Sequence, residues 1–227
     1  MKKLLKKVTL AVVTMLLCTT LSYGKNGEPS KNNELNLHSA YVDKIKEVKV
    51  RKDAVKDFGM ESSVWKDQSA ELQSAIAELS ELGGGVLYLP YGTYLFRGVR
   101  MMSNVHIVIA EGATLKPYWG DQNKVCMFSF SNDNSKSSEY IENCSIRAEK
   151  GSYIVNYSEV PKNQKAGIRF AAFKMVKNFS VADADIKDNY TTYCAFSLSP
   201  ADAPNSLSWE VDRPTNGEFR HCKIYQA

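Results

Sequence analysis

The chain has 227 residues, enough for one domain with a sizeable core or for two small ones, and 44% hydrophobic and 24% charged residues are ordinary for a soluble globular protein. The formal net charge of +4 comes from four lysines in the first 24 residues, since the rest carries 29 − 4 = 25 basic and 25 acidic side chains. The charge balance therefore gives no support to a nucleic-acid-binding function.

The first 24 residues have the three parts of a secretory signal peptide. Met1–Lys7 is basic, and Val8–Cys18 is an apolar run too short to span a bilayer. Ser22 and Gly24 place small residues before a cleavage site after Gly24. We expect a bacterial protein that is secreted or periplasmic and has no transmembrane segment.

A helix is predicted after a polar arm. Residues 25–44 are rich in Asn and Ser and are expected to form a linker, and Val55–Met60 is expected to form a short strand and turn. Asp67 is a candidate N-cap and Gly83 a left-handed C-cap for a helix over Gln68–Leu82. Its apolar residues lie three and four apart on one face: Leu72, Ala75, Ile76, Leu79 and Leu82.

Short strands follow the helix, each bounded by Gly, Pro, Asn or Ser. None is long enough to build a large sheet alone. The predicted strands are Gly85–Pro90, Gly92–Met101, Asn104–Ile109, Ala113–Pro117 and Val125–Phe130.

An Asn followed by apolar, polar and apolar residues recurs in "SNVHIVI", "ENCSIRA" and "KNFSVAD". The asparagines are Asn104, Asn143 and Asn178, at intervals of 39 and 35 residues. A further copy aligns Phe179–Asn189 with Glu218–Ala227 at an offset of 38. Strands that recur at such an interval indicate a solenoid or a propeller, and each repeat fits one long coil or two coils of roughly 20 residues.

A single helix before the repeats, without a Trp-Asp signature, favours a parallel β-helix over a propeller. The predicted fold is an all-β solenoid, a right-handed parallel β-helix with an N-terminal capping α-helix, over residues 45–227. Ala227 directly follows a predicted strand. We therefore expect the chain to be truncated and to hold the N-terminal part of a longer β-helix domain that is a monomer when complete.

The mature chain has no recognisable metal or cofactor motif. Its cysteines, at intervals of 18, 50 and 28 residues, fit no zinc motif and are expected to be buried free thiols: Cys126, Cys144, Cys194 and Cys222. No histidine has a partner at metal-ligand spacing, and His106 is expected to point outward from its strand. We expect no metal and no cofactor, with Ca²⁺ left open on the acidic residues of Asp183–Asp188.

The segment Lys49–Gly98, with "DQSAELQSAIAEL" and "GGGVLYLPYGTYLF", resembles the N-terminal module of the pectate-lyase-like right-handed β-helix superfamily. The segment Cys126–Ala227, with "IENCSI", "FKMVKNFSVADADIKDNYTTY" and "RPTNGEFRHCKIYQA", is similar to iota-carrageenases. The resemblance implies an exported enzyme that degrades polysaccharide. No residue here matches the catalytic acid and base of iota-carrageenases, so the catalytic coils are expected beyond residue 227.

The acidic candidates for catalysis are Asp185 and Asp188. If Ala184 and Ile186 point inward, Asp185 points outward, and glycoside hydrolysis needs two such carboxylates. A solvated strand face is the favoured interpretation, because one Asp-x-Asp motif is not specific.

A substrate-binding surface is predicted on the same strands. The offset of 38 places Lys223 beside Asp185 and Tyr225 beside Lys187. Basic side chains could bind sulfate or carboxylate groups of an anionic polysaccharide, and tyrosines could stack on sugar rings. The candidates are Lys187, Tyr190, Arg220, Lys223 and Tyr225, with Tyr193 as a further stacking residue.

The predicted function is an exported glycoside hydrolase acting on an acidic polysaccharide, either a sulfated galactan such as carrageenan or a pectic polymer. Two alternatives stay open. One is a polysaccharide lyase of the pectate-lyase type, and the other is a carbohydrate-binding or adhesion β-helix without catalysis.

Overall fold

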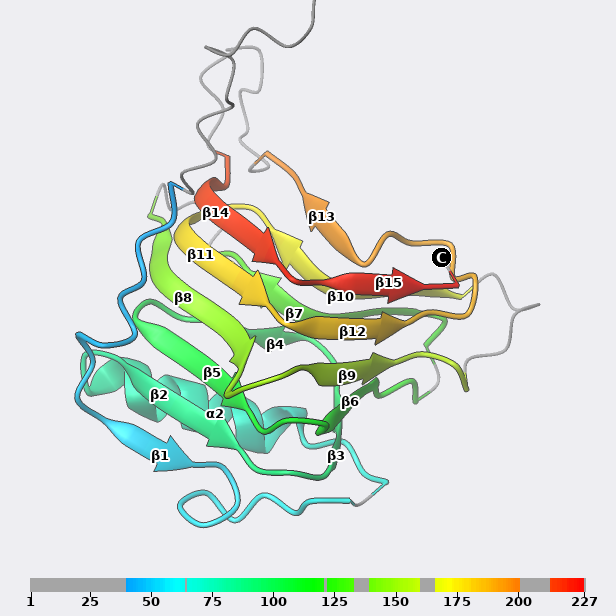
Figure 1. Cartoon of the computed structure of the whole chain (residues 1–227), viewed down its shortest axis with the longest axis horizontal. Coiled ribbons are helices and arrows are strands. Elements are labelled where there is room, and N and C mark those ends of the chain that lie inside the picture. The colour runs from blue at the N-terminus through cyan, green and yellow to red at the C-terminus, as the bar shows by residue number, and fades with distance from the viewer. Residues whose placement is uncertain are drawn as a thin grey trace, which may run out of the picture. The chain divides into compact units, whose positions relative to one another are not determined.

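The computed structural model describes residues 40–63, 65–120, 122–132, 139–159, 166–200 and 213–226. The described residues belong to one unit, Ser39–Ala227. One helix, α2 (Ser69–Glu81), is followed by short strands that pair in parallel (Figure 1). The predicted signal peptide and residues 25–39 of the predicted arm lie outside the described residues.

The strands form three sheets, which we name A, B and C. Sheet A contains β1 (Arg51–Asp53), β2 (Gly85–Leu89), β5 (Val105–Ile109), β8 (Ile141–Ala148), β11 (Val176–Ala182) and β14 (Thr215–Arg220). Sheet B contains β3 (Thr93–Phe96), β6 (Thr114–Pro117), β9 (Tyr153–Asn156), β12 (Ala184–Lys187) and β15 (Lys223–Tyr225). Sheet C contains β4 (Val99–Arg100), β7 (Lys124–Phe130), β10 (Gly167–Phe173) and β13 (Phe196–Leu198).

From β2 onward the chain visits sheets A, B and C in turn, and each strand pairs in parallel with the equivalent strand of the next turn. This path is a parallel β-helix and confirms the predicted solenoid. Val86 pairs with His106, 20 residues later, so the first coil is short. His106, Ser145, Ser180 and Glu218 then pair in succession at offsets of 39, 35 and 38, so each predicted repeat is one coil.

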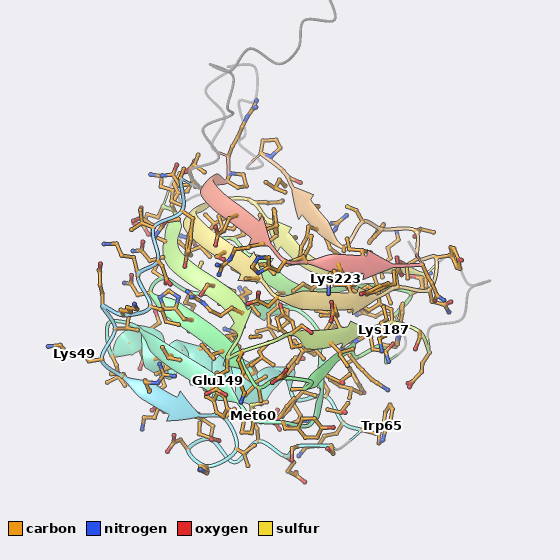
Figure 2. All side chains as sticks on the ribbon, in the orientation of Figure 1. Lys49, Met60, Trp65, Glu149, Lys187 and Lys223 are labelled. Atoms are coloured by element: carbon orange, nitrogen blue, oxygen red, sulfur yellow. The ribbon has the colours of Figure 1, made fainter. Side chains whose placement is uncertain are left out.

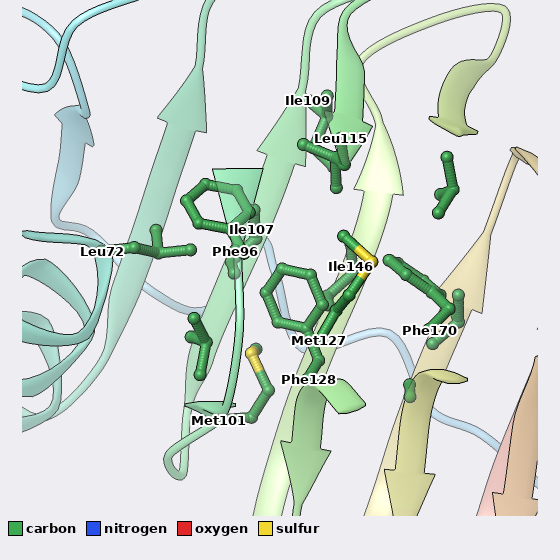
Figure 3. Packing of buried hydrophobic residues seen from close by; sticks show 14 of the residues in the cluster. Leu72, Phe96, Met101, Ile107, Ile109, Leu115, Met127, Phe128, Ile146 and Phe170 are labelled. Carbon is green, nitrogen blue, oxygen red and sulfur yellow. The ribbon is translucent and has the colours of Figure 1, made fainter. Parts of the chain in front are cut away.

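The core lies between the three sheets and under α2. Figure 3 shows Leu72 of the helix facing the same interior as Phe96, Ile107 and Phe128 from the sheets. Each large side chain of this kind contributes about 1.5–3 kcal/mol when it is withdrawn from water. The helix covers the first coil with the face predicted from its spacing, since Leu72, Ala75, Ile76 and Leu79 are all buried. Leu82, which was predicted on the same face, is instead the C-cap residue and is 56% exposed.

The predicted C-terminal glycine signal is confirmed, whereas the predicted N-cap is one residue off. The Asp67 carboxylate accepts a hydrogen bond of 3.0 Å from the backbone N–H of Ser69, although the N-cap position itself is Gln68. At the other end Gly83 has φ +87°, and its N–H donates to the carbonyl of Ser80 while that of Gly84 donates to Leu79. These two bonds form a Schellman motif.

The repeated asparagines form a ladder where the coil enters sheet A. Asn104, Asn143, Asn178 and Asn216 all have φ between 53° and 60°, the left-handed region that Asn tolerates better than most residues. The amide of Asn143 donates to Asn104 at 3.0 Å, and the amide of Asn178 donates to Asn143 at 2.8 Å. The recurring sequence pattern therefore marks one corner of the coil.

Residues 40–44, which belong to the predicted arm, are bound to sheet A. The backbone N–H of Val42 donates to Asn178 at 2.7 Å, and the Asn178 amide donates back to the Val42 carbonyl at 2.9 Å. Asp43 forms an ion pair of 2.7 Å with Arg147 on β8. We call residues 40–44 the strap.

The structure corrects three local predictions. The strand expected within Val55–Met60 is instead β1, and Val55–Phe58 is a turn. His106 points away from the core but is fully buried. The four cysteines are free, but only Cys144 is buried, whereas Cys194 is exposed because it lies in the connection before β13.

Candidate functional site

The outer face of sheet B carries four of the predicted site residues. Asp185 pairs with Lys223 and Lys187 with Tyr225, which confirms the predicted offset. The Lys223 ammonium lies 3.7 Å from Asp185 Oδ1. Figure 2 shows Lys187 and Lys223 on this side of the ribbon.

The two carboxylates proposed for catalysis have structural partners. Asp185 Oδ2 accepts a hydrogen bond of 2.6 Å from Ser152. Asp188 is buried, and its Oδ1 accepts the backbone N–H groups of Asn189 at 2.7 Å and Thr191 at 3.3 Å. This pattern closes a turn after β12, as Asp side chains commonly do. The bonding therefore favours structural roles for both residues.

The remaining predicted residues are distributed over other surfaces. Arg220 ends β14 in sheet A, with its Nε 3.8 Å from Glu218. Tyr190 lies in the exposed turn after β12, with φ 55°. Tyr193 lies against sheet C. The predicted groove is therefore not one continuous surface.

Sequence reasoning missed the outer face of sheet C, where Arg169 is the central residue. Arg169 pairs with Cys126 on β7, and its guanidinium carbon lies 4.9 Å from the centre of the Tyr193 ring. The ring is packed on Gly167, where an added Cβ would meet it at 2.8 Å. In the described part of the chain, no carboxylate forms an ion pair with Arg169. The guanidinium is held by stacking, and no described carboxylate compensates its charge.

Two cysteines flank Arg169. Cys194 Sγ lies 3.9 Å from Arg169 Nη2, and Cys126 lies one strand away on the other side. Neighbouring strands are about 4.8 Å apart, so the two cysteines are about 10 Å apart and too far for a disulfide. Cys126 is half-buried, and the partial loss of solvent around its thiol raises its pKa.

Sheet C is bordered by the longer connections of the coil. Residues 118–123, 157–166 and 188–195 connect sheet B to sheet C, and residues 131–140 and 199–214 connect sheet C to sheet A. A hollow of about 590 Å³ borders sheet C near Arg100, Ser131 and Tyr140. No outward residue of the described strands in sheet C is acidic. This face, which we call the sheet C face, can bind anions and sugar rings but supplies no carboxylate of its own.

A sequence signal for the sheet C face was weak. Strand β10 follows β7 at an offset of 43 residues, and β13 follows β10 at an offset of 25. The irregular connections break the interval that is visible in sheet A. The remaining clue to this face was the alternation along β10, where the buried apolar Ile168 lies between Gly167 and Arg169.

The described residues contain no group of three or more His, Cys, Asp or Glu side chains arranged to hold a metal ion. Within the same residues, no helix is long and apolar enough to cross a membrane.

The coil of three parallel sheets, closed by α2 and bearing a basic and aromatic face, defines a right-handed parallel β-helix protein. The chain belongs to the family described as rhamnogalacturonase A/epimerase, pectate lyase-like, which matches residues 54–193.

Two curated relatives are iota-carrageenases. That of Zobellia galactanivorans is 35% identical over 155 residues, covering 67% of this chain and 30% of the relative. That of Alteromonas macleodii is 30% identical over 164 residues, covering 70% of this chain and 31% of the relative. The chain thus spans about a third of the length of these relatives, and the carrageenase-like resemblance is confirmed.

Solved structures agree with this relationship. An iota-carrageenase complexed to iota-carrageenan fragments superimposes with a TM-score of 0.67 at 27% identity, covering 81% of this chain and 38% of that structure. An exopolygalacturonase from Thermotoga maritima superimposes with a TM-score of 0.53 at 15% identity, over 78% of this chain and 47% of that one. The second likeness shows the fold alone.

Proposed function

We propose that this chain belongs to an exported glycoside hydrolase that acts on a sulfated galactan, and that its described coils bind the polymer. The observation that carries the proposal is the likeness to iota-carrageenases in both sequence and structure. A pectic substrate is the second candidate that the sequence left open; the family description is compatible with it, but both curated relatives are iota-carrageenases.

The sheet C face supports binding of a sulfated polymer. A planar guanidinium can donate two parallel hydrogen bonds to a sulfate, and Arg169 is held for this by Tyr193 with no competing carboxylate among the described residues. Exposed Lys124, on the neighbouring strand, adds a second cation. Parallel strands place Arg169 and Lys124 on one face of sheet C, and such a flat face suits a linear polymer.

Hydrolysis needs a pair of carboxylates, one to protonate the leaving oxygen and one to activate water or attack carbon. Because the described strands of sheet C offer none, we propose that the acid and base come from outside them. Asp185 and Asp188 remain predictions for this role, although their hydrogen bonds favour structure.

Affinity electrophoresis of the purified chain in gels containing iota-carrageenan tests the binding. We expect retardation by iota-carrageenan but not by the desulfated polymer or by polygalacturonate. Arg169→Ala should weaken binding about tenfold or more, because it removes a charge-assisted contact, whereas Arg51→Ala, on the edge strand β1, should not. Equal retardation by the desulfated polymer, or no effect of Arg169→Ala, would contradict the proposal.

The reaction type is tested by incubating the protein with iota-carrageenan and analysing the products. A hydrolase yields new reducing ends on saturated sugars, whereas a lyase leaves an unsaturated sugar. Unsaturated products would establish the lyase alternative. Binding with no products would favour the non-catalytic alternative for this chain.

Export is a separate part of the proposal and rests on the N-terminal sequence. N-terminal sequencing of protein recovered outside the cytoplasm should begin at Lys25. Recovery of the intact N-terminus there would contradict signal cleavage after Gly24.

A further inference from the structure

Trp65 is an exposed aromatic residue with a fixed position. Its side chain is 68% exposed, yet the Lys116 ammonium lies 4.1 Å from the centre of its ring. Lys116 is itself held by Glu159 at 2.5 Å, and only 12% of its side chain is exposed. A large aromatic face is therefore presented to solvent on a rigid support.

A small pocket opens beside Trp65. Its volume is about 230 Å³, and aromatic, amide and carboxylate side chains line it, including Trp119, Asn156 and Glu159. Asn156 uses its carbonyl oxygen to accept the N–H of Ser158 at 2.9 Å, which leaves its amide nitrogen as a donor without a partner in the described part of the chain. Apolar walls with a few polar groups are typical of ligand sites.

The pocket continues into a row across sheet B. Lys187 pairs with Asn156 on β9 and with Tyr225 on β15, and Lys116 comes directly after Leu115, whose partner Val155 precedes Asn156. Strand spacing makes this row about 14 Å long, which is the scale of a few sugar units. Lys187 is exposed and has no salt-bridge partner in the described part of the chain, and Tyr225 is 46% exposed. Figure 2 shows Trp65 and Lys187 on the same side of the ribbon.

We infer that Trp65, the adjoining pocket and the row from Lys116 to Tyr225 form a second binding site for an anionic polysaccharide, distinct from the sheet C face. The inference rests on the proposed function for the identity of the polymer. The indole stacks on a sugar ring, Asn156 donates to a hydroxyl group, and the Lys187 ammonium meets a sulfate or carboxylate. The site retains a long chain on the protein while the sheet C face engages another part of it.

The experiment measures affinity for iota-carrageenan by gel retardation in four variants: Trp65→Ala, Trp65→Phe, Lys187→Ala and Tyr91→Ala. Tyr91 is the matched control, since it is 74% exposed and lies in the turn between β2 and β3. We expect Trp65→Ala to weaken binding about five- to tenfold and Trp65→Phe to retain most of it, since an aromatic face remains. Lys187→Ala should reduce binding to the sulfated polymer, and Tyr91→Ala should leave it unchanged.

Combination with Arg169→Ala separates this inference from the proposed function. If the chain has two sites, the double variant Trp65→Ala/Arg169→Ala should bind more weakly than either single variant. If Arg169→Ala weakens binding and Trp65→Ala does not, the second site is overturned while the proposed function stands. If neither the wild-type chain nor any variant binds sulfated polymer, the proposed function fails first.

Fluorescence gives a readout that does not depend on retardation. The chain has three tryptophans, Trp65, Trp119 and Trp209, and Trp65 is highly exposed. Iota-carrageenan should change the emission of the wild-type chain, and Trp65→Phe should lose most of that change. Because Trp119 lines the same pocket, the contradicting result is an unchanged response in the double variant Trp65→Phe/Trp119→Phe, which would also overturn the second site.

Discussion

His106 shows how the surroundings of one residue determine its chemistry. Its Nδ1 lies 2.8 Å from Ser145 Oγ, and its buried Nε2 has no hydrogen-bond partner among the described residues. Burial is the main cause that lowers its pKa to about 4, and the nearby Arg147 lowers it further, whereas Asp43 of the strap opposes the shift. The imidazole is therefore neutral at neutral pH.

The stability of the fold should fall in acid because of this residue. The pKa of His106 is lower in the folded state than its value of 6.5 in the unfolded state, so the unfolded state binds more protons between these two values. The contribution of His106 to stability is therefore complete above pH 6.5 and is lost as the pH falls towards 4. The difference between the folded and unfolded pKa values of His106 corresponds to about 3 kcal/mol of folding stability. Urea unfolding at several pH values checks this, and His106→Gln, which stays neutral, should lose most of the dependence. An unchanged pH dependence in that variant would refute the assignment.

Asp43 produces a second step at lower pH. Its hydrogen bond with Arg147 lowers the pKa of the carboxyl to about 2, so its contribution is complete above about pH 4 and is lost as pH falls towards 2. Asp43→Asn should remove that step, visible as a flatter unfolding profile below pH 4, and should retain the His106 step with the pKa of His106 lowered further, because the opposing charge of Asp43 is gone. Loss of both steps together would show that the strap and His106 act as one unit.

At the scale of elements, the junction between α2 and β2 depends on two glycines with different constraints. Gly83 and Gly84 both have positive φ, 87° and 120°. An added Cβ at Gly83 meets nothing within 4 Å, whereas at Gly84 it meets the Cβ of Asn104 at 2.4 Å and its carbonyl at 2.6 Å. The close approach of Gly84 to Asn104 joins the end of α2 to the corner that the asparagine ladder forms.

Two alanine substitutions separate backbone strain from close packing. Gly83→Ala should cost about 1–2 kcal/mol, because only the left-handed backbone opposes it. Gly84→Ala should cost clearly more, at least about 3 kcal/mol, because the clash adds to the strain. Urea midpoints of the two variants give the comparison, and equal losses would show that Asn104 moves aside easily.

The asparagine ladder is the second device at this scale. Asn143 combines a left-handed backbone at φ 57° with hydrogen bonds to Asn104 and Asn178. Asn143→Gly keeps the backbone and should cost about 1–2 kcal/mol for the lost bonds, whereas Asn143→Ala should cost about 2–4 kcal/mol because strain is added. Thermal or urea unfolding ranks the variants. An alanine variant as stable as the glycine variant would mean that the corner changes conformation.

At the scale of the whole molecule, charge is local rather than global. Residues 25–227 contain 25 basic and 25 acidic side chains, so attraction to a sulfated polymer must come from patches such as those around Arg169 and Lys187. Such contacts are sensitive to screening.

Raising NaCl from about 0.1 M to about 1 M shortens the Debye length from about 10 Å to about 3 Å, so the affinity for iota-carrageenan should fall steeply. Arg169→Gln should bind more weakly at low salt and show a shallower salt dependence, as measured by titration. Equal slopes in the variant and the wild-type chain would place the ionic contacts elsewhere.

The sequence predicted the repeating parts of the fold and little of the candidate site. Helix periodicity identified α2, the recurring Asn identified the repeat, and the offset of 38 residues identified the register between β12 and β15. The sheet C face was missed because its strands follow connections of unequal length. The residues of the expected groove lie on different surfaces. Arg220 and Lys223 are only three residues apart, but the chain turns a corner between them at His221, which has φ 52°.

The sequence by itself determined the solenoid, since apolar alternation and left-handed asparagines are local properties that every coil repeats. Only the tertiary structure decided which polar side chains share a face. Arg169 stacks on Tyr193, and Trp65 is fixed by Lys116, across separations of 24 and 51 residues that no local pattern encodes. Coil stacking places such residues in contact because parallel strands about 4.8 Å apart align positions that are distant in the chain.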